Sequence, residues 1–153
     1  MRIAIGSDHA GYQLKEHLRT WMAEREIDVR DVGARSLDTT DDYPDFARAV
    51  GELVQTAQVE LGIVICSTGV GSCIAANKLR GVRAALAHDT FSARMSRLHN
   101  DANVLCLGAG IVAPHYAEEI LAAWLAVSFS GDERHRRRLD KVARLEARED
   151  GQP

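Results

Sequence analysis

A cysteine followed by small and hydroxyl-bearing residues gives the strongest chemical signal in the chain. Cys66 comes directly after the apolar run 61–65, and the residues from Ser67 to Gly71 separate it from an amphipathic segment that begins near Ser72. A loop between a buried strand and the first turn of a helix can direct backbone N–H groups at an anion. The same surroundings favour the thiolate form of a cysteine. The segment therefore predicts a thiol beside a site for a small anionic substrate.

Asp8 and His9 form a second candidate group, directly after the predicted strand 2–7. The imidazole of His9 can bind a phosphate or transfer protons, whereas Asp8 can also serve simply as a cap for the next helix. Gly11 allows a ligand to approach the backbone closely. Open parallel sheets bind ligands outside the carboxyl ends of their strands. The chemically capable residues gather at the ends of strands 2–7 and 61–66, where we expect the site.

Two further groups allow either a functional or a structural interpretation. His99 lies between a predicted helix and a predicted strand, where it can act as a catalytic residue or simply interact with the helix dipole. The basic cluster 134–138 (Arg-His-Arg-Arg-Arg) is either a solvated helix face or a clamp for a phosphate. Arg134 and Arg138 are four residues apart and share one helix face, so both can bind a single phosphate through charge-assisted hydrogen bonds.

Several familiar motifs are absent from the sequence. A Walker A loop ends in Gly-Lys-Ser/Thr, but Gly71 is followed by Ser72 and Cys73. A cysteine-phosphatase loop needs an arginine six positions after its cysteine, where this chain has Ser72. The glycines of segment 6–11 lack the dinucleotide-binding spacing. No His/Cys/Asp group has zinc-type spacing, so the sequence predicts no bound metal ion.

Length, charge and cysteine content limit the class of protein. The 153 residues fit a single domain at 1–150 with a frayed tail at 149–153. A net charge of −3 gives no indication of nucleic-acid binding, and no apolar run reaches the roughly 20 residues of a membrane helix. The N-terminus begins as a strand rather than a signal peptide. Three cysteines do not make a disulfide framework, and Cys73 and Cys106 are interpreted as packing residues. These features indicate a protein of the reducing cytoplasm.

Short β-branched runs alternate with longer amphipathic segments along the chain. The predicted strands are 2–7, 27–32, 61–66, 83–87 and 103–107. The predicted helices are 10–25, 44–57, 72–79, 90–98, 114–127 and 132–148. This alternation indicates an α/β fold, in which helices cover both faces of a five-stranded parallel sheet.

Taken together, the motifs resemble the ribose-5-phosphate isomerase B family, which also includes the galactose-6-phosphate isomerase subunits. They cover almost the whole chain and are found at 6–11, 42–47, 66–71, 74–78, 81–85, 99–105 and at Arg134-His135 with Arg138. The resemblance implies a three-layer Rossmann-like fold. It also implies interconversion of an aldose phosphate and a ketose phosphate through a cis-enediolate, without a metal ion or an organic cofactor.

The resemblance also implies a role for each candidate residue. Cys66 matches the base that takes the C2 proton of the aldose, and Thr68 matches a residue that acts at the substrate oxygens. His99 matches the acid that opens the furanose ring, with Asp8 assisting. The backbone N–H groups that match the anion hole belong to Ser67, Thr68, Gly69, Val70 and Gly71. The residues that match the remaining substrate contacts are Asn100 and, for the phosphate, His9, Arg134 and Arg138.

Active sites of the resembled family are shared between subunits, which implies that His99 and Asn100 come from a neighbouring chain. A homodimer is then the minimal catalytic unit, and a homotetramer is the other assembly implied. Family members often carry Gly where Ser67 stands. They usually carry Arg where Gly110 stands, and that arginine reaches the phosphate from the partner subunit. Its absence removes one charge-assisted contact, worth about 1.5–3 kcal/mol.

The leading hypothesis is an isomerase for D-ribose 5-phosphate and D-ribulose 5-phosphate in the pentose phosphate pathway. Gly110 leaves open a substrate of another length, such as allose 6-phosphate, galactose 6-phosphate or a tetrose 4-phosphate. A hypothesis from another class is a non-catalytic module that binds phosphosugars. The presence of Cys66, Thr68 and His99 argues against this module, because a binding protein has no need of a base.

Overall fold

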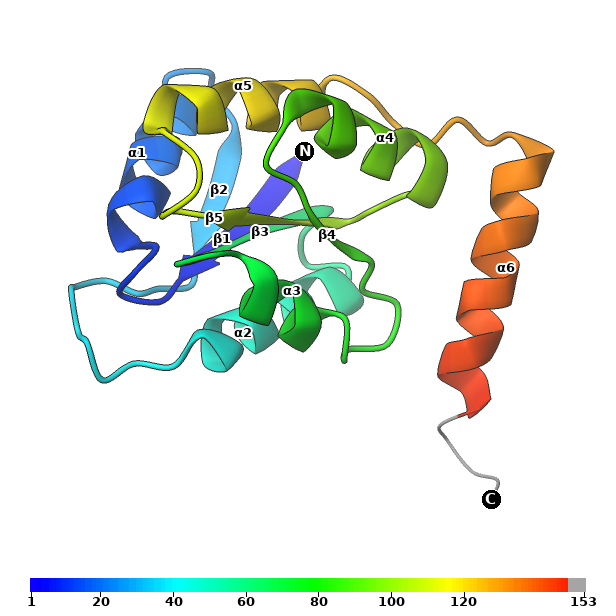
Figure 1. Cartoon of the computed structure of the whole chain (residues 1–153), viewed down its shortest axis with the longest axis horizontal. Coiled ribbons are helices and arrows are strands. Elements are labelled where there is room, and N and C mark those ends of the chain that lie inside the picture. Colours follow the sequence, from blue (N-terminus) through cyan, green and yellow to red (C-terminus); the bar gives the residue numbers. More distant parts are fainter. Residues whose placement is uncertain (149–153) are drawn as a thin grey trace.

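The computed structural model describes residues 1–148 and contains a five-stranded, fully parallel sheet (Figure 1). Its strands are β1 (Arg2–Ser7), β2 (Asp28–Asp31), β3 (Leu61–Cys66), β4 (Ala84–Leu86) and β5 (Val104–Gly108). Their order across the sheet is β2-β1-β3-β5-β4. The predicted α/β fold is therefore confirmed, whereas the tail predicted at 149–153 lies outside the described residues.

Helices cover both faces of this sheet. Within the described residues they are α1 (Tyr12–Ala23), α2 (Tyr43–Gln55), α3 (Val70–Ala76), α4 (Thr90–Asn100), α5 (Pro114–Leu125) and α6 (Glu133–Arg148). Figure 1 shows α1, α4 and α5 on one face and α2 and α3 on the other, with α6 standing away from the sheet at the right. In residues 1–148, no helix is both long and apolar enough to cross a membrane.

The central strands separate two apolar cores. Successive side chains of a strand point to opposite faces, and helices on both faces bury both sets. Ile5 of β1 and Ile65 of β3 belong to the core that also contains residues of α1 and α5. Ala4 and Val64 belong to the core that also contains residues of α2 and α3. Burial on both faces explains why β1 and β3 appear in the sequence as continuous apolar runs.

Two helices next to the strand ends begin at other residues than predicted. α3 begins at Val70 rather than at Ser72, because Gly69 takes a left-handed conformation (φ 76°) that starts the helix directly after a short loop. α1 begins at Tyr12 rather than at Ala10. The backbone there first makes a turn, in which the Gly11 N–H donates to the Asp8 carbonyl at 3.1 Å. The segment between β3 and α3 is therefore shorter than predicted, whereas the segment between β1 and α1 is longer and is ordered by this turn.

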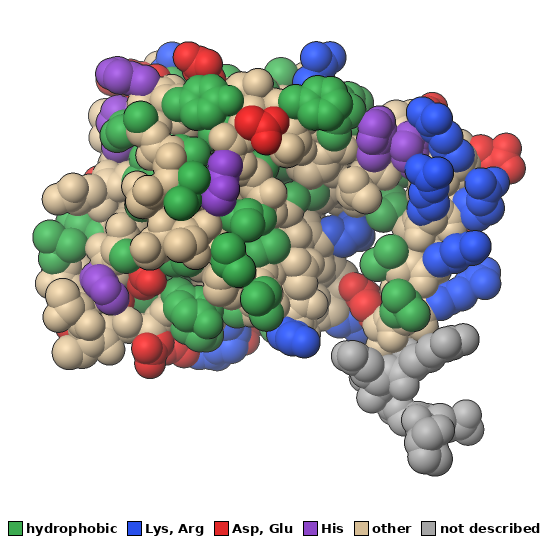
Figure 2. Space-filling view, in the orientation of Figure 1, with side chains coloured by type: hydrophobic (Ala, Val, Ile, Leu, Met, Phe, Trp, Pro, Cys, Tyr) green, Lys and Arg blue, Asp and Glu red, His purple; other side chains and the backbone are tan. Residues whose placement is uncertain are grey.

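α6 leaves an apolar face uncovered within its own chain. Leu139, Val142 and Leu145 follow one side of the helix, and Val142 and Leu145 are 45% and 62% exposed. These side chains line one wall of an open cavity of about 470 Å³ between α6 and the body of the protein. Figure 2 shows the basic side chains of α6 on its outer side, at the right of the view.

Candidate active site

The candidate site lies at the carboxyl ends of β1 and β3, the neighbouring strands at which the strand order reverses. β1 pairs with β2 on one side and with β3 on the other, and Ser7 is in register with Ile65. Such a switch point is the usual ligand site of an open parallel sheet. Gly11 allows the tight approach of α1 here, because a Cβ at this position would lie 2.6 Å from the Ile65 carbonyl oxygen. Asp8 and Cys66 are therefore held at the ends of neighbouring strands.

The sulfur of Cys66 is held by the loop that follows it. Its side chain is buried, and Sγ accepts a hydrogen bond from the Gly69 N–H at 3.1 Å. Gly69 can turn back toward the sulfur because of its positive φ. A Cβ there would also lie 2.9 Å from the Leu107 carbonyl carbon. The geometry fixes the thiol at the carboxyl end of β3, as the sequence predicts.

The segment after β5 supports the same loop from the other side. The Ala109 N–H donates to the Cys66 carbonyl at 2.9 Å, and the Gly110 N–H donates to the Ser67 carbonyl at 2.8 Å. Gly108 passes so close that an added Cβ would lie 2.6 Å from the Thr68 carbonyl oxygen. The loop is thus positioned by backbone hydrogen bonds, which leaves its side chains available for contacts with a ligand.

The remaining loop residues surround the start of α3. Ser67, Thr68 and Val70 are exposed, and the Val70 N–H makes a long hydrogen bond (3.4 Å) to the Thr68 hydroxyl. Gly71 lies against the ring of Tyr43, since a Cβ would be 2.6 Å from Cζ of that ring. The predicted anion loop therefore combines exposed hydroxyl groups with N–H groups at the first turn of a helix.

Asp8 is buried beside this loop. Its Oδ1 accepts a hydrogen bond from the Gly11 N–H at 3.0 Å, so the carboxylate orders the turn before α1 without capping the helix itself. Burial raises the pKa of Asp8 above the ordinary value for aspartate, although the hydrogen bond from Gly11 opposes this shift. A carboxylate with a raised pKa is a better proton acceptor than an exposed one.

Asp41 orients His9, a contact that was not predicted from the sequence. One oxygen, Oδ1 of Asp41, lies 2.6 Å from Nδ1 of His9 and also accepts the His9 backbone N–H at 2.9 Å. The hydrogen bond to Asp41 raises the pKa of His9. Because Nδ1 makes this contact, Nε2 is available to bind a ligand. The raised pKa means that the imidazole keeps its positive charge to a higher pH. In the sequence, Asp41 shows only as one of several acidic residues in the polar loop 34–43.

His99 and His135 form a second group at the end of α4 and the beginning of α6. Their rings stack with a centroid distance of 4.3 Å and an interplanar angle of 8°. His135 is 3% exposed, and burial lowers its pKa. Its Nε2 lies 3.2 Å from Nε of Arg134, which donates. A neutral His135 therefore supports the ring of His99. In the sequence, His135 belongs to the basic cluster and to the motif Arg134-His135, but no role is predicted for it.

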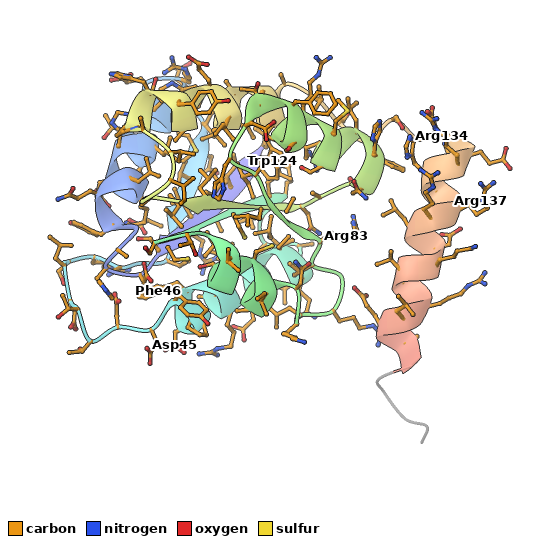
Figure 3. All side chains as sticks on the ribbon, in the orientation of Figure 1. Asp45, Phe46, Arg83, Trp124, Arg134 and Arg137 are labelled. Atoms are coloured by element: carbon orange, nitrogen blue, oxygen red, sulfur yellow. The ribbon has the colours of Figure 1, made fainter. Side chains whose placement is uncertain are left out.

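One chain does not bring all the predicted residues together. Asp8, His9 and residues 66–71 lie at the carboxyl edge of the sheet, at the left of Figure 1, because β1 and β3 run in that direction. His99 and Asn100 end α4, and Arg134 and Arg138 belong to α6 on the opposite side. Figure 3 shows Arg134 at the right edge of the molecule, well separated from the ends of β1 and β3. The predicted site is thus divided into two groups.

Cys73 is a second free thiol, which the sequence analysis interprets as a packing residue. It is half-buried in α3 and lies against Cys106 of β5. A hydrogen bond from Cys106 stabilises its thiolate and lowers the pKa of Cys73 to about 7, while the same contact raises the pKa of Cys106. Experiments on thiol chemistry in this protein therefore need to separate Cys66 from Cys73.

Known proteins match the chain over most of its length. A family model described as Ribose/Galactose Isomerase matches residues 3–142. Ribose-5-phosphate isomerase B of Escherichia coli (strain K12) is 42% identical over 147 residues, which are 96% of this chain and 97% of that protein. D-erythrulose-4-phosphate isomerase of Pectobacterium atrosepticum is 38% identical over 131 residues, which are 86% of each chain.

Solved structures are similar over the same extent. Ribose-5-phosphate isomerase B of Clostridium thermocellum has a TM-score of 0.95 at 44% identity, covering 97% of this chain and 99% of that one. Ribose-5-phosphate isomerase B of Mycoplasma genitalium, solved with bound ribulose-5-phosphate, has a TM-score of 0.91 at 42% identity and covers 96% and 97%. The fold, the sequence motifs and these matches agree, and the chain belongs to the ribose/galactose isomerase family of sugar-phosphate isomerases.

Proposed function

We propose that this protein interconverts D-ribose 5-phosphate and D-ribulose 5-phosphate through a cis-enediolate, with Cys66 as the base. The observation that carries the proposal is the position of the Cys66 sulfur, at the switch point of the sheet and hydrogen-bonded to the Gly69 N–H. The relatives named ribose-5-phosphate isomerase B support the choice of substrate. A structure of one of them, from Mycoplasma genitalium, contains ribulose-5-phosphate.

The first step opens the furanose ring. His99 of a neighbouring chain donates a proton to the ring oxygen O4, while Asp8 accepts the proton of the hydroxyl on C1. The bond between C1 and O4 breaks, and C1 becomes the aldehyde carbon. The raised pKa of Asp8 suits a proton acceptor, and the stacked ring of His135 holds His99 in position.

The second step moves one proton between carbons and one between oxygens. The Cys66 thiolate takes the proton from C2, a double bond forms between C1 and C2, and negative charge develops on O1. The N–H groups from Ser67 to Gly71 stabilise this charge. Thr68 assists the transfer of the O2 proton to O1. The Cys66 thiol then returns its proton to C1, and the carbonyl group is left on C2.

The phosphate contacts and the division of the site imply a homodimer as the minimal unit. His9 belongs to the group around Cys66, whereas Arg134 and Arg138 belong to the group around His99. A second copy also accounts for the large apolar side chains exposed on the face seen in Figure 2. Exposed large apolar side chains of the described residues include Val70, Ile74, Leu86, Phe91 and Ile111. An isologous contact of two chains would cover the same apolar surface on both.

An activity assay on matched cysteine variants tests the proposal. The purified protein, Cys66→Ala and Cys73→Ala are each mixed with ribose 5-phosphate, and formation of the ketose is followed. We expect Cys66→Ala to lose about 10²–10⁴-fold in kcat, the usual contribution of a positioned base. Cys73→Ala should keep its turnover, because Cys73 contacts Cys106 rather than the loop. Undiminished turnover by Cys66→Ala would remove the thiol from the mechanism.

A tetrose 4-phosphate is the second candidate substrate. Gly110 stands where the family usually has an arginine, and some relatives are named D-erythrulose-4-phosphate isomerase. A tetrose 4-phosphate cannot form a furanose, because the oxygen on C4 carries the phosphate. Its isomerisation needs no ring-opening acid.

His99→Asn therefore distinguishes the two substrates. If ribose 5-phosphate is the substrate, the variant should lose most of its activity on that sugar but keep whatever activity the wild type shows on a tetrose 4-phosphate. A wild-type protein that is active only on the four-carbon substrate would replace the first assignment with the second. Allose 6-phosphate and galactose 6-phosphate complete the panel, and activity on either alone would assign a hexose phosphate.

A further inference from the structure

Two histidines and a glutamate come together on the outer side of α1 and α5. His17 belongs to α1, and His115 and Glu118 belong to the first part of α5. Oε1 of Glu118 lies 2.6 Å from Nε2 of His17 and 3.5 Å from Nδ1 of His115. All three donor atoms lie within 4.8 Å of one another. Figure 2 shows histidine side chains at the upper left, over these helices.

The kind and number of these donors suit a transition-metal ion. Two imidazoles and one carboxylate form the three-residue set that holds zinc with one position open to water. In a tetrahedral site with bonds of about 2.0–2.1 Å, donor atoms are separated by about 3.3 Å. The Glu118–His115 separation is already close to this value. The side chain of His115 is 91% exposed, so its ring can turn toward an ion without repacking the interior.

We propose that His17, His115 and Glu118 bind one divalent transition-metal ion per chain, with zinc as the best match to this donor set. The ion lies between His17 and Glu118, whose side chains contact each other directly when it is not bound. A water molecule completes its coordination shell. The ion links the middle of α1 to the first turn of α5. Spacing in the sequence could not indicate the site, because His17 and Glu118 are 101 residues apart.

The site is separate from the residues proposed to act on the sugar. Its donors lie on helix surfaces and make no described contact with Cys66 or His99. If the ion binds, it should stabilise the folded protein whether or not the isomerase proposal is correct. A metal ion bound only by the folded protein raises the melting temperature as the free ion concentration increases.

Metal titration of the full chain tests this proposal. Zn²⁺ is titrated against the metal-free protein in competition with a chromophoric chelator. His115→Ala removes an exposed ligand with little effect on folding, and Glu119→Gln serves as the control at the neighbouring exposed carboxylate. We expect one ion per chain and a loss of affinity of at least tenfold in His115→Ala. We also expect Zn²⁺ to raise the melting temperature of the wild type and of Glu119→Gln but not of His115→Ala.

Cobalt provides a second measurement, because the cysteines of this chain are also potential ligands. Co²⁺ bound by nitrogen and oxygen donors shows visible d–d bands without the near-ultraviolet charge-transfer band of a thiolate ligand. We expect the first type of spectrum, and we expect it to be lost in His115→Ala. Equal Zn²⁺ affinities of wild type and His115→Ala, a thiolate spectrum, or no binding at all would each overturn the proposal.

Discussion

At the scale of single residues, Asp41 has the largest effect on the charge of His9. The contact with Asp41 raises the pKa of His9. The protonated form is therefore favoured in the folded protein, and its stabilisation is fully present below the unfolded value of about 6.5. This stabilisation is lost as the pH rises through the folded pKa. Any phosphate contact of His9 should weaken over the same range, because neutral imidazole lacks the charge that strengthens the bond.

Asp41→Asn should therefore weaken substrate binding at neutral pH. The amide removes the negative charge, so the pKa of His9 falls and the imidazole loses its proton at lower pH. We expect KM for the sugar phosphate to rise about tenfold near neutral pH, as for a lost charge-assisted bond, with little change in kcat. Steady-state kinetics across pH measure this effect. Asp42→Asn, at the exposed neighbouring residue, is the control, and identical pH profiles of the two variants would contradict the assignment.

Substitution of Gly110 tests whether an arginine at this position, as the resembled family usually has, would contact the phosphate. A Cβ at this position would lie 3.1 Å from the Ser67 carbonyl oxygen, which is tight but requires only a small shift. Gly110→Arg should lower KM for the preferred sugar phosphate by about 10–100-fold relative to Gly110→Ala, because it adds a charge-assisted contact worth about 1.5–3 kcal/mol. Gly110→Ala introduces the same Cβ without the charge. Equal KM values for the two variants would show that no phosphate lies within reach of this position.

The sequence predicted the position of candidate site residues that directly follow a strand. It could not predict contacts between segments that meet only when the chain folds. Cys66 and Asp8 were predicted because a buried run ends directly before each. Asp41 is 32 residues from His9 in the chain, and a polar loop gives no sign of which acid will reach the imidazole. His135 was missed for a related reason. Its stacking on His99 joins two helices whose relative position no periodicity determines.

At the scale of elements, a buried cation fixes α1 against the sheet. The side chain of Lys15 is fully buried, and its Nζ donates to Oε1 of Glu16 at 2.6 Å and to Oδ2 of Asp31 at 2.7 Å. Asp31 is the last residue of β2. A buried ammonium group is tolerated only while it is paired. The position of α1 matters for the site, because Asp8 and His9 lie immediately before it.

This pairing predicts unequal effects of the two partners on stability. Lys15→Met replaces the cation with an apolar side chain of similar length, and the carboxylates of Glu16 and Asp31 are 33% and 24% exposed, so water can hydrate them. The free energy of unfolding should therefore change by less than about 1.5 kcal/mol. Asp31→Asn leaves the ammonium buried with a weaker partner and should cost about 3 kcal/mol. Urea unfolding with comparison of the m-values measures both. A larger loss in Lys15→Met than in Asp31→Asn would show that the cation itself stabilises the fold.

Among the elements, the buried strands were the easiest to predict. β1 and β3 have the predicted bounds, Arg2–Ser7 and Leu61–Cys66, because strands covered on both faces are uniformly apolar. β4 is shorter than predicted, at Ala84–Leu86. As the edge strand of the sheet it pairs only with β5. Helix starts were less predictable, since they depend on conformations such as that of Gly69 rather than on hydrophobic periodicity.

At the scale of the whole molecule, the position of α6 determines how the site can be completed. The helix carries Arg134 away from the sheet (Figure 3), includes Arg138, and leaves Val142 and Leu145 exposed. Its amphipathic pattern predicted a helix, but the pattern alone could not show that the apolar face stays uncovered in one chain. In the proposed dimer, α6 would place Arg134 and Arg138 beside the second copy, at the edge where His9 and Cys66 lie.

Mixing two inactive variants tests this shared site. Cys66→Ala and His99→Asn each remove one of the two groups, so each homodimer should be inactive on ribose 5-phosphate. In a mixed dimer, one site combines the intact Cys66 of one chain with the intact His99 of the other, and the second site lacks both. Random exchange of equal amounts makes about half of the dimers mixed, so about a quarter of the wild-type activity should return.

The return of activity should follow subunit exchange in time, and size-exclusion chromatography of the mixture should show a single assembly. Two copies of one variant, mixed in the same way, provide the control and should stay inactive. If both residues acted within the same chain, each mixed dimer would contain one site without Cys66 and one without His99. The mixture would then stay inactive however completely the chains exchanged, and the division of the site between subunits would be disproved.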